Sequence, residues 1–225
     1  MSILDLVFPK TCLGCGRLGS YICSDCVAKV RLAQPICPYC ERASIDGITH
    51  VRCQKKLGLD GLISIWEYEG VIRKAILALK YKYATLVGQE LTDHFLHQLL
   101  TGFLPVNSKV LVPIPLYWYR ENTRGFNQSI EIGKSISEAM NWKFLPDLLI
   151  KKQSTISQVE LKGDDRRQNL RGVFTANPIH KSLFVNLNSV IVFDDVFTTG
   201  STLREAAKVL KRAGVEKVWG MTIAR

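Results

Sequence analysis

The sequence lacks any apolar run of membrane-spanning length. Nothing in its 225 residues approaches the roughly 18 consecutive apolar residues that a transmembrane helix needs. The N-terminal segment also lacks the basic leader and the small-residue cleavage site of a signal peptide, and Asp5 interrupts its short apolar stretch. These absences predict a cytoplasmic protein that does not insert into a membrane.

Disulfides are not expected either, because cysteines in a reducing compartment are more often metal ligands or free thiols. The seven cysteines include three Cys-x-x-Cys pairs, which are followed by one His-x-x-Cys pair. A two-residue gap lets both side chains of a tight turn reach the same tetrahedral zinc, and two such turns complete a structural site. Pairing the turns in sequence order predicts two zinc sites, formed by Cys12, Cys15, Cys23 and Cys26 and by Cys37, Cys40, His50 and Cys53.

The spacing leaves two questions open: an interleaved pairing of the turns, and whether His50 is a ligand or a surface residue. Neither zinc is expected to be catalytic, since four protein ligands leave no open position on the metal. Residues 1–60 show no periodic helix and would have little core without metal, so they are predicted to form a zinc-finger module. A linker over 54–61 then leads to a second domain over 61–225.

Acidic residues are the scarcer charge. The chain has 20 acidic and 30 basic residues, a formal net charge of +10, and two occupied zinc sites would lower it to about +7. Residues 1–60 hold 8 of the basic and 5 of the acidic residues, so the surplus belongs mainly to the second domain. A polyanion such as single-stranded DNA would be attracted chiefly there, although a solvated basic surface with no ligand explains the charge equally well.

Apolar periodicity in the second domain predicts strands that alternate with helices. Short apolar runs predict buried strands over 62–66, 110–115, 190–193 and 218–223. Apolar residues at spacings of three and four predict helices after Gly70, over 84–100, after Gln128 and after Ser201. This order predicts an α/β fold with a mainly parallel open sheet flanked by helices, with ligand loops at the carboxyl ends of the strands.

The stretch 190–202, VIVFDDVFTTGST, is the strongest candidate site. Asp194 and Asp195 are placed where the buried strand stops, and a turn of small residues follows and runs into a helix. Such a turn lets backbone N–H groups converge on a phosphate, while two acids suit vicinal hydroxyls or a magnesium ion held partly by the ligand. The alternative is a buried strand followed by an ordinary helix N-cap.

This stretch resembles the 5-phosphoribosyl-1-pyrophosphate (PRPP) signature of type I phosphoribosyltransferases. The resemblance implies a phosphoribosyltransferase-like fold that binds PRPP with magnesium, and it makes Asp194 and Asp195 the catalytic candidates. The implied PRPP-binding residues are Asp194, Asp195, Thr198, Thr199, Gly200, Ser201 and Thr202. In the relatives that salvage 6-oxopurines an Asp stands where this chain has Thr198, so a 6-oxopurine substrate is disfavoured.

Two further segments carry candidate ligand residues. Arg124 lies beside a glycine at the start of a helix, where its paired donors suit a diphosphate, and with Tyr117 it is predicted to bind pyrophosphate. Lysines alternate with tyrosines over 80–83, as in a platform for single-stranded nucleic acid, although tyrosines closing a helix against the core explain this equally well. The predicted nucleic-acid-binding residues are Lys80, Lys82, Arg166 and Arg167.

The cysteine pairs, the loop before Gln128, the segment 155–174 and the PRPP stretch together resemble the competence protein F family (ComF, also called ComFC). The family commonly has a fourth cysteine pair where this chain has His50-x-x-Cys53. The resemblance implies a PRPP-binding protein that handles single-stranded DNA during natural transformation, with a helicase-like partner in DNA uptake. The alternative is an active phosphoribosyltransferase of nucleotide metabolism that transfers phosphoribose to a nitrogen acceptor. No acceptor base is indicated, so both classes stay open.

Overall fold

The computed structural model describes residues 9–79, 84–102, 104–116, 127–152 and 172–225. The strands in these ranges are Gly61–Trp66 (β1), Val110–Pro113 (β2), Lys143–Phe144 (β3), Leu149–Lys151 (β4), Phe174–Ala176 (β5), Ser189–Val196 (β6) and Lys217–Ala224 (β7). Five of them form a sheet in the order β1-β7-β6-β2-β3, in which every neighbouring pair is parallel. β4 and β5 form a separate antiparallel pair. The predicted open parallel sheet is confirmed.

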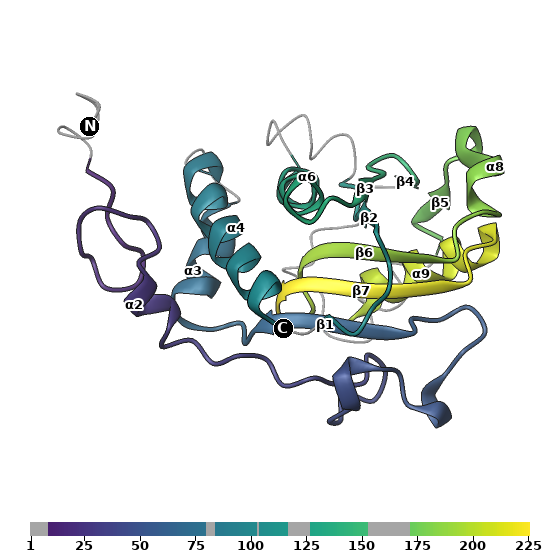
Figure 1. Cartoon of the computed structure of the whole chain (residues 1–225), viewed down its shortest axis with the longest axis horizontal. Helices are drawn as coiled ribbons and strands as arrows, with labels where there is room; N and C mark the ends of the chain where they lie inside the picture. Colours follow the sequence, from purple (N-terminus) through teal and green to yellow (C-terminus); the bar gives the residue numbers. More distant parts are fainter. Residues whose placement is uncertain (1–8, 80–83, 103, 117–126, 153–171) are drawn as a thin grey trace.

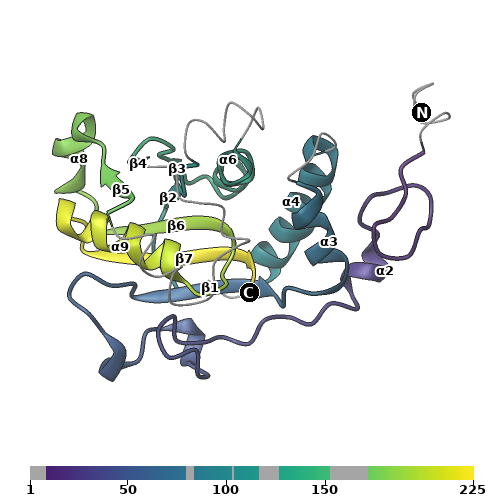
Figure 2. The ribbon, with the colours of Figure 1, turned by 180° about the vertical axis from the view of Figure 1, so that it is seen from behind.

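Helices cover both faces of this sheet (Figures 1 and 2). The helical segments are Ser24–Val27 (α2), Gly70–Ala78 (α3), Ala84–Thr101 (α4), Gln128–Met140 (α6), Lys181–Phe184 (α8) and Ser201–Ala213 (α9), with 3-10 turns at Ile45–Gly47 (η1), Val51–Cys53 (η2) and Pro178–His180 (η3). α3, α4 and α6 share one core with Ile191 and Phe193 of β6, whereas α9 shares the other with Val190 and Val192. Alternate residues of β6 therefore serve opposite faces, as the period of a strand requires.

The helix predicted over 84–100 is α4. Its buried stripe is Val87, Leu91, Phe95 and Leu99, at a regular spacing of four. Leu86 precedes this stripe by one position and is 46% exposed, so it lies outside the packed face. No helix in the part of the chain that the structure describes is both long and apolar enough to cross a bilayer.

β6 continues farther than its apolar run predicts. Its pairing with β7 extends through Asp194, which lies opposite Thr222, to Val196, which lies opposite Ala224. The two acids thus belong to the last residues of the strand rather than to the loop behind it. Because successive strand residues point to opposite sides, the two carboxylates occupy different surroundings.

The N-terminal residues pack against the sheet domain instead of standing apart from it. Figure 1 shows their chain passing beside β1, with the first part against α3 and α4 and the later part near the other end of β1. The linker prediction is wrong at its end. Leu59 is 2% exposed, Asp60 N–H donates to Val218 O at 2.9 Å, and Gly61 already begins β1. The pairing of Asp60 and Gly61 with β7 explains the difference.

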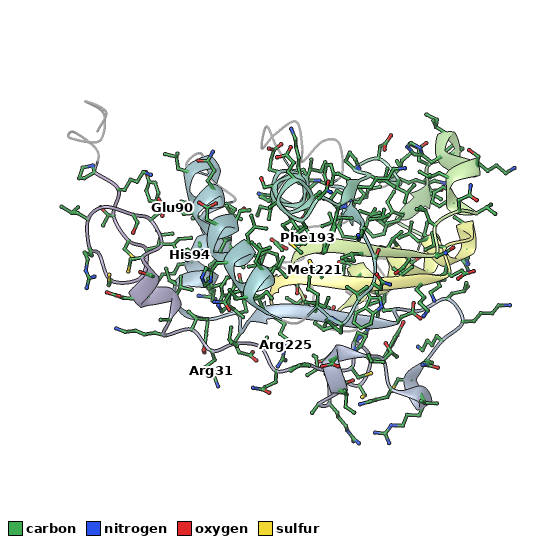
Figure 3. All side chains as sticks on the ribbon, viewed as in Figure 1. Arg31, Glu90, His94, Phe193, Met221 and Arg225 are labelled. Carbon is green, nitrogen blue, oxygen red and sulfur yellow. The ribbon has the colours of Figure 1, made fainter. Side chains whose placement is uncertain are left out.

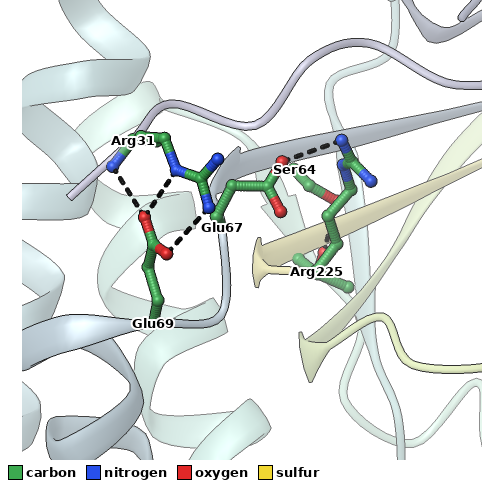
Figure 4. A network of polar contacts seen from close by, with 6 residues as sticks. Arg31, Ser64, Glu67, Glu69 and Arg225 are labelled. Atoms are coloured by element: carbon green, nitrogen blue, oxygen red, sulfur yellow. Dashed lines mark hydrogen bonds and ion pairs between the residues drawn. The ribbon is translucent and has the colours of Figure 1, made fainter.

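A polar network fastens the passing segment to the ends of β1 and β7 (Figure 4). Arg31 donates from Nε and Nη2 to the two oxygens of Glu69, both at 2.9 Å. Arg225 donates to Glu67 at 2.9 Å, and its backbone N–H bonds to Trp66 O at 3.0 Å. The last residue of the chain is thereby tied to the residues that connect β1 to α3.

Candidate functional site

The first predicted zinc site is assembled in the structure. The sulfurs of Cys12, Cys15, Cys23 and Cys26 lie within 4.8 Å of one another. Cys12 Sγ is 3.6 Å from Cys23 Sγ, and Cys15 Sγ is 3.8 Å from it. Four sulfurs bound to zinc at about 2.3 Å would lie about 3.8 Å apart, so the cluster has the dimensions of a tetrahedral site. These separations are far longer than a disulfide bond.

The second cluster includes the histidine. Cys37, Cys40, His50 and Cys53 also place their ligand atoms within 4.8 Å of one another, and Cys40 Sγ lies 3.3 Å from His50 Nδ1. The other ring nitrogen, Nε2, lies 3.1 Å from Ala43 O. A metal-binding imidazole ordinarily donates its second nitrogen to a carbonyl in this way, which fixes the ring. The structure therefore groups the turns sequentially and favours Nδ1 of His50 as the fourth ligand atom.

The first cluster is anchored on the sheet domain. Glu90 of α4 accepts the backbone N–H groups of Tyr21 and Ile22 at 2.7 and 2.9 Å, and Lys10 Nζ at 3.3 Å. His94, one turn along the same helix, lies with Nε2 2.9 Å from Ile22 O. Figure 3 shows Glu90 and His94 facing the first cluster. The first cluster and α4 are thus joined by contacts between side chains of the helix and the backbone of Tyr21 and Ile22.

A second set of polar groups gathers at the carboxyl ends of β2 and β6. Asp194 Oδ1 accepts the hydroxyl of Ser129 at 3.3 Å and the backbone N–H of Asp195 at 3.0 Å. Ser129 is placed by the start of α6, where the Asn127 side chain accepts Ser129 N–H at 3.0 Å. Asp195 Oδ1 accepts Val196 N–H at 2.8 Å. Sequence analysis did not single out Ser129, although it directly follows the loop that was singled out.

The carboxyl group of Asp194 has a raised pKa. Burial, and after it the charge of the neighbouring Asp195 carboxylate, raise the pKa of Asp194 to about 8. The hydrogen bonds from Asp195 N–H and Ser129, and the charge of Lys151, lower the pKa of Asp194 but do not offset the rise. Near neutral pH the pair therefore holds a proton, because two adjacent half-buried carboxylates do not both ionise readily.

The turn behind β6 leads directly into α9. Gly200 is the N-cap of this helix and adopts φ = 68°, and a Cβ there would lie 2.5 Å from the Phe197 ring. Thr199 Oγ1 and Ser201 Oγ lie 2.6 Å apart. Like any helix start, α9 leaves the N–H groups of its first turn without helical acceptors. Together with the positive end of the helix dipole, they form a suitable cradle for a phosphate.

The structure places only part of the predicted site residues. The acids and the turn 198–202 are described and lie in one continuous stretch. The predicted pyrophosphate residues Tyr117 and Arg124 lie outside the described residues. The same holds for the predicted nucleic-acid residues Lys80, Lys82, Arg166 and Arg167.

Comparison with known proteins supports the zinc sites. Residues 3–55 match a family described as the double zinc ribbon domain. This match and the two ligand clusters identify the N-terminal part as a zinc-binding module.

The chain also has curated relatives, one of which matches most of its length. It is 36% identical to "Competence protein F" of Haemophilus influenzae over 118 residues, which is 52% of this chain and 51% of that protein, so the alignment spans about half of either. It is 30% identical to "DNA utilization protein YhgH" of Salmonella typhi over 88% of this chain and 87% of that protein. Among solved structures, the chain is similar to the glutamine PRPP amidotransferase of B. subtilis complexed with ADP and GMP. The aligned part is 62% of this chain and 27% of the amidotransferase chain, with 18% identity and a TM-score of 0.41.

Proposed function

The chain belongs to the family of competence protein F and the DNA utilization protein YhgH. We propose that it binds PRPP with magnesium and handles single-stranded DNA during DNA uptake. The observation that carries the proposal is the continuous stretch from Asp194 to Thr202 at the carboxyl end of a central parallel strand. Ligands of open α/β sheets bind at such strand ends.

In this proposal two groups of residues in the stretch bind different parts of PRPP. The N–H groups and hydroxyls of 198–202 hold the 5-phosphate at the start of α9. Asp194 and Asp195 hold the ribose hydroxyls, and the Ser129 hydroxyl keeps the Asp194 carboxyl in place. The predicted pyrophosphate residues Tyr117 and Arg124 complete the site.

Magnesium suits this arrangement because its preferred ligands are carboxylate, water and phosphate oxygens. When bound, the ion would neutralise charge on the diphosphate. Should the protein also turn over PRPP, positive charge would develop on the ribose as pyrophosphate leaves, and the acidic pair is placed to stabilise it. The alternative function, an active phosphoribosyltransferase, uses the same residues.

The DNA part of the proposal is supported by the relatives' names and by charge. "DNA utilization" and "competence" describe the relatives, and the basic surplus of this chain lies in residues 61–225. Lys80, Lys82, Arg166 and Arg167 are the proposed contacts. We expect affinity for single-stranded DNA to fall steeply with salt, because neutralised phosphates release counterions. Affinity that stays flat between low and high salt would contradict the electrostatic account.

Thermal unfolding tests the PRPP site. Magnesium with PRPP is expected to raise the melting temperature of the wild type, because a ligand that binds only the folded state stabilises it. Replacing both acids, Asp194→Asn with Asp195→Asn, should abolish the shift. Asp93→Asn, an exposed aspartate on α4, is the matched control and should leave the shift intact. A shift that persists in the double variant would refute the site.

Released pyrophosphate separates the two functions. The protein is incubated with PRPP, magnesium and a panel of nucleobases. Release that depends on one base and on the acidic pair would establish the transferase. Binding without release would leave the DNA-handling role with PRPP as a bound ligand.

A further inference from the structure

One arginine connects the second zinc cluster to the turn 198–202, the proposed phosphate-binding turn, which we call the phosphate turn. Arg204, in the first turn of α9, donates from Nε to Pro38 O at 2.9 Å and also from Nη2 to the same oxygen. Pro38 lies in the turn between the zinc-ligand candidates Cys37 and Cys40, and we call this turn the knuckle. A carbonyl of the zinc knuckle thus accepts a forked, charged contact from a residue 166 positions away in the sequence.

The knuckle also holds this guanidinium by stacking. Arg204 Cζ lies 5.1 Å from the centre of the Tyr39 ring, and the Tyr39 hydroxyl accepts Leu59 N–H at 2.9 Å. Lys55 Nζ lies 5.0 Å from the same ring. Glu41, just past the knuckle, adds a weaker ion pair to Arg204 at 3.9 Å. The side chain of Arg204 is only 22% exposed, so these contacts are partly shielded from water.

On its other side, Arg204 borders the turn. Its Cζ lies 3.3 Å from the point where a Cβ on Gly200 would stand, and its backbone N–H donates to Gly200 O at 2.9 Å. Gly200 is the N-cap of α9 and carries the positive φ on which the turn depends. Arg204 therefore connects the knuckle to the residue that shapes the proposed phosphate cradle.

We propose that Arg204 is a positioning residue that couples the second zinc site to the phosphate turn. Zinc fixes the knuckle of Cys37 and Cys40, the knuckle presents Pro38 O and the Tyr39 ring, and these hold Arg204 and with it the first turn of α9. Loss of zinc from this cluster then loosens the turn. The coupling itself is structural; only its effect on PRPP rests on the proposed function.

Hydrogen exchange tests the coupling without any ligand. In Arg204→Ala, exchange of the amides of 205–207, which α9 protects, should be roughly tenfold faster, the factor for one lost hydrogen bond to a charged group. The zinc content should stay at two per chain. Arg204→Lys keeps the charge but cannot donate two hydrogen bonds to Pro38 O from one planar group, so exchange at 205–207 should be faster than in the wild type but slower than in Arg204→Ala. Arg212→Ala, an exposed arginine on the same helix, should change nothing.

The zinc side of the coupling needs its own variant. Cys40→Ser should lower the zinc content by one and speed exchange at 205–207, because the knuckle is then no longer fixed. Faster exchange in both Arg204→Ala and Cys40→Ser supports the coupling. Exchange that is unchanged in either variant overturns it.

Affinity for PRPP with magnesium connects the coupling to the ligand. Arg204→Ala should weaken binding by roughly tenfold, while Arg212→Ala should not. If the wild type binds no PRPP, the proposed function fails, and the exchange experiment still decides whether the coupling exists. If the wild type binds and Arg204→Ala binds equally well, the coupling does not reach the ligand, and the extension of the proposal to PRPP is overturned.

Discussion

Asp194 and Asp195 are neighbours in the sequence, yet they differ in their partners. Asp194 accepts hydrogen bonds from Ser129 and from the backbone of Asp195, while Asp195 Oδ1 accepts the N–H of Val196. The acids could be found from the sequence because a double acid after an apolar run is a local pattern. Ser129 and Arg204 could not, since their contacts join residues 65 and 166 positions apart.

The raised pKa of Asp194 predicts a pH dependence of stability. The folded state binds the proton up to about pH 8, whereas the unfolded chain releases it near the ordinary aspartate value. Between these two values the folded state holds more protons, so the free energy of unfolding should fall as pH rises, by about 1 kcal/mol per pH unit or less. Denaturant unfolding at several pH values measures this slope.

The matched variant is Asp194→Asn, which cannot titrate. Its free energy of unfolding should fall less steeply than that of the wild type over the same pH range. Identical slopes in the two proteins would show that Asp194 does not hold the proton.

Among the elements, α4 serves two purposes. Its stripe of Val87, Leu91, Phe95 and Leu99 packs into the core. Its Glu90 and His94 contact the backbone just before Cys23 of the first zinc cluster. The helix followed from apolar residues at spacings of three and four in the sequence, but the place of Val87 in its buried stripe did not. The polar contacts of Glu90 and His94 could not be predicted, because apolar spacing does not show which backbone groups of a distant segment will lie opposite a polar helix residue.

Removing the Glu90 carboxylate should therefore destabilise the protein. In Glu90→Ala the N–H groups of Tyr21 and Ile22 lose their acceptor, and each unsatisfied half-buried group costs about 1–2 kcal/mol. We expect a loss of about 2–4 kcal/mol in the free energy of unfolding, measured with denaturant. Gln89→Ala, at an exposed neighbouring position, should change it by less than about 0.5 kcal/mol. Equal effects of the two substitutions would contradict the anchoring role of Glu90.

For the whole molecule, the sequence predicted a zinc module of residues 1–60 joined by a linker to a sheet domain. The parallel sheet followed from apolar periodicity. Cysteine spacing predicted the sequential ligand sets but left open an interleaved pairing and the role of His50, and the structure groups the turns sequentially with His50 included. How closely the two parts pack did not follow. Cys12, Ile22, Cys26, Val27 and Val30 share a core with α3 and α4, and Leu59 is buried where a linker was predicted.

This shared core predicts how zinc removal acts. Chelation should lower the melting temperature of the entire protein in a single calorimetric transition, because the unfolded knuckles would expose part of the common core. Zinc content measured beside the scan shows that the metal has left. Two transitions, with the upper one at the melting temperature of the zinc-bound protein, would mean that the module unfolds independently.

A crystal structure with PRPP and magnesium tests the central claim most directly. The account predicts the 5-phosphate at the turn 198–202 on the N-terminal end of α9, and the ribose hydroxyls within hydrogen-bond distance of Asp194 and Asp195. Density for the ligand at any other place would contradict it. So would a turn that holds only water molecules in a crystal saturated with PRPP.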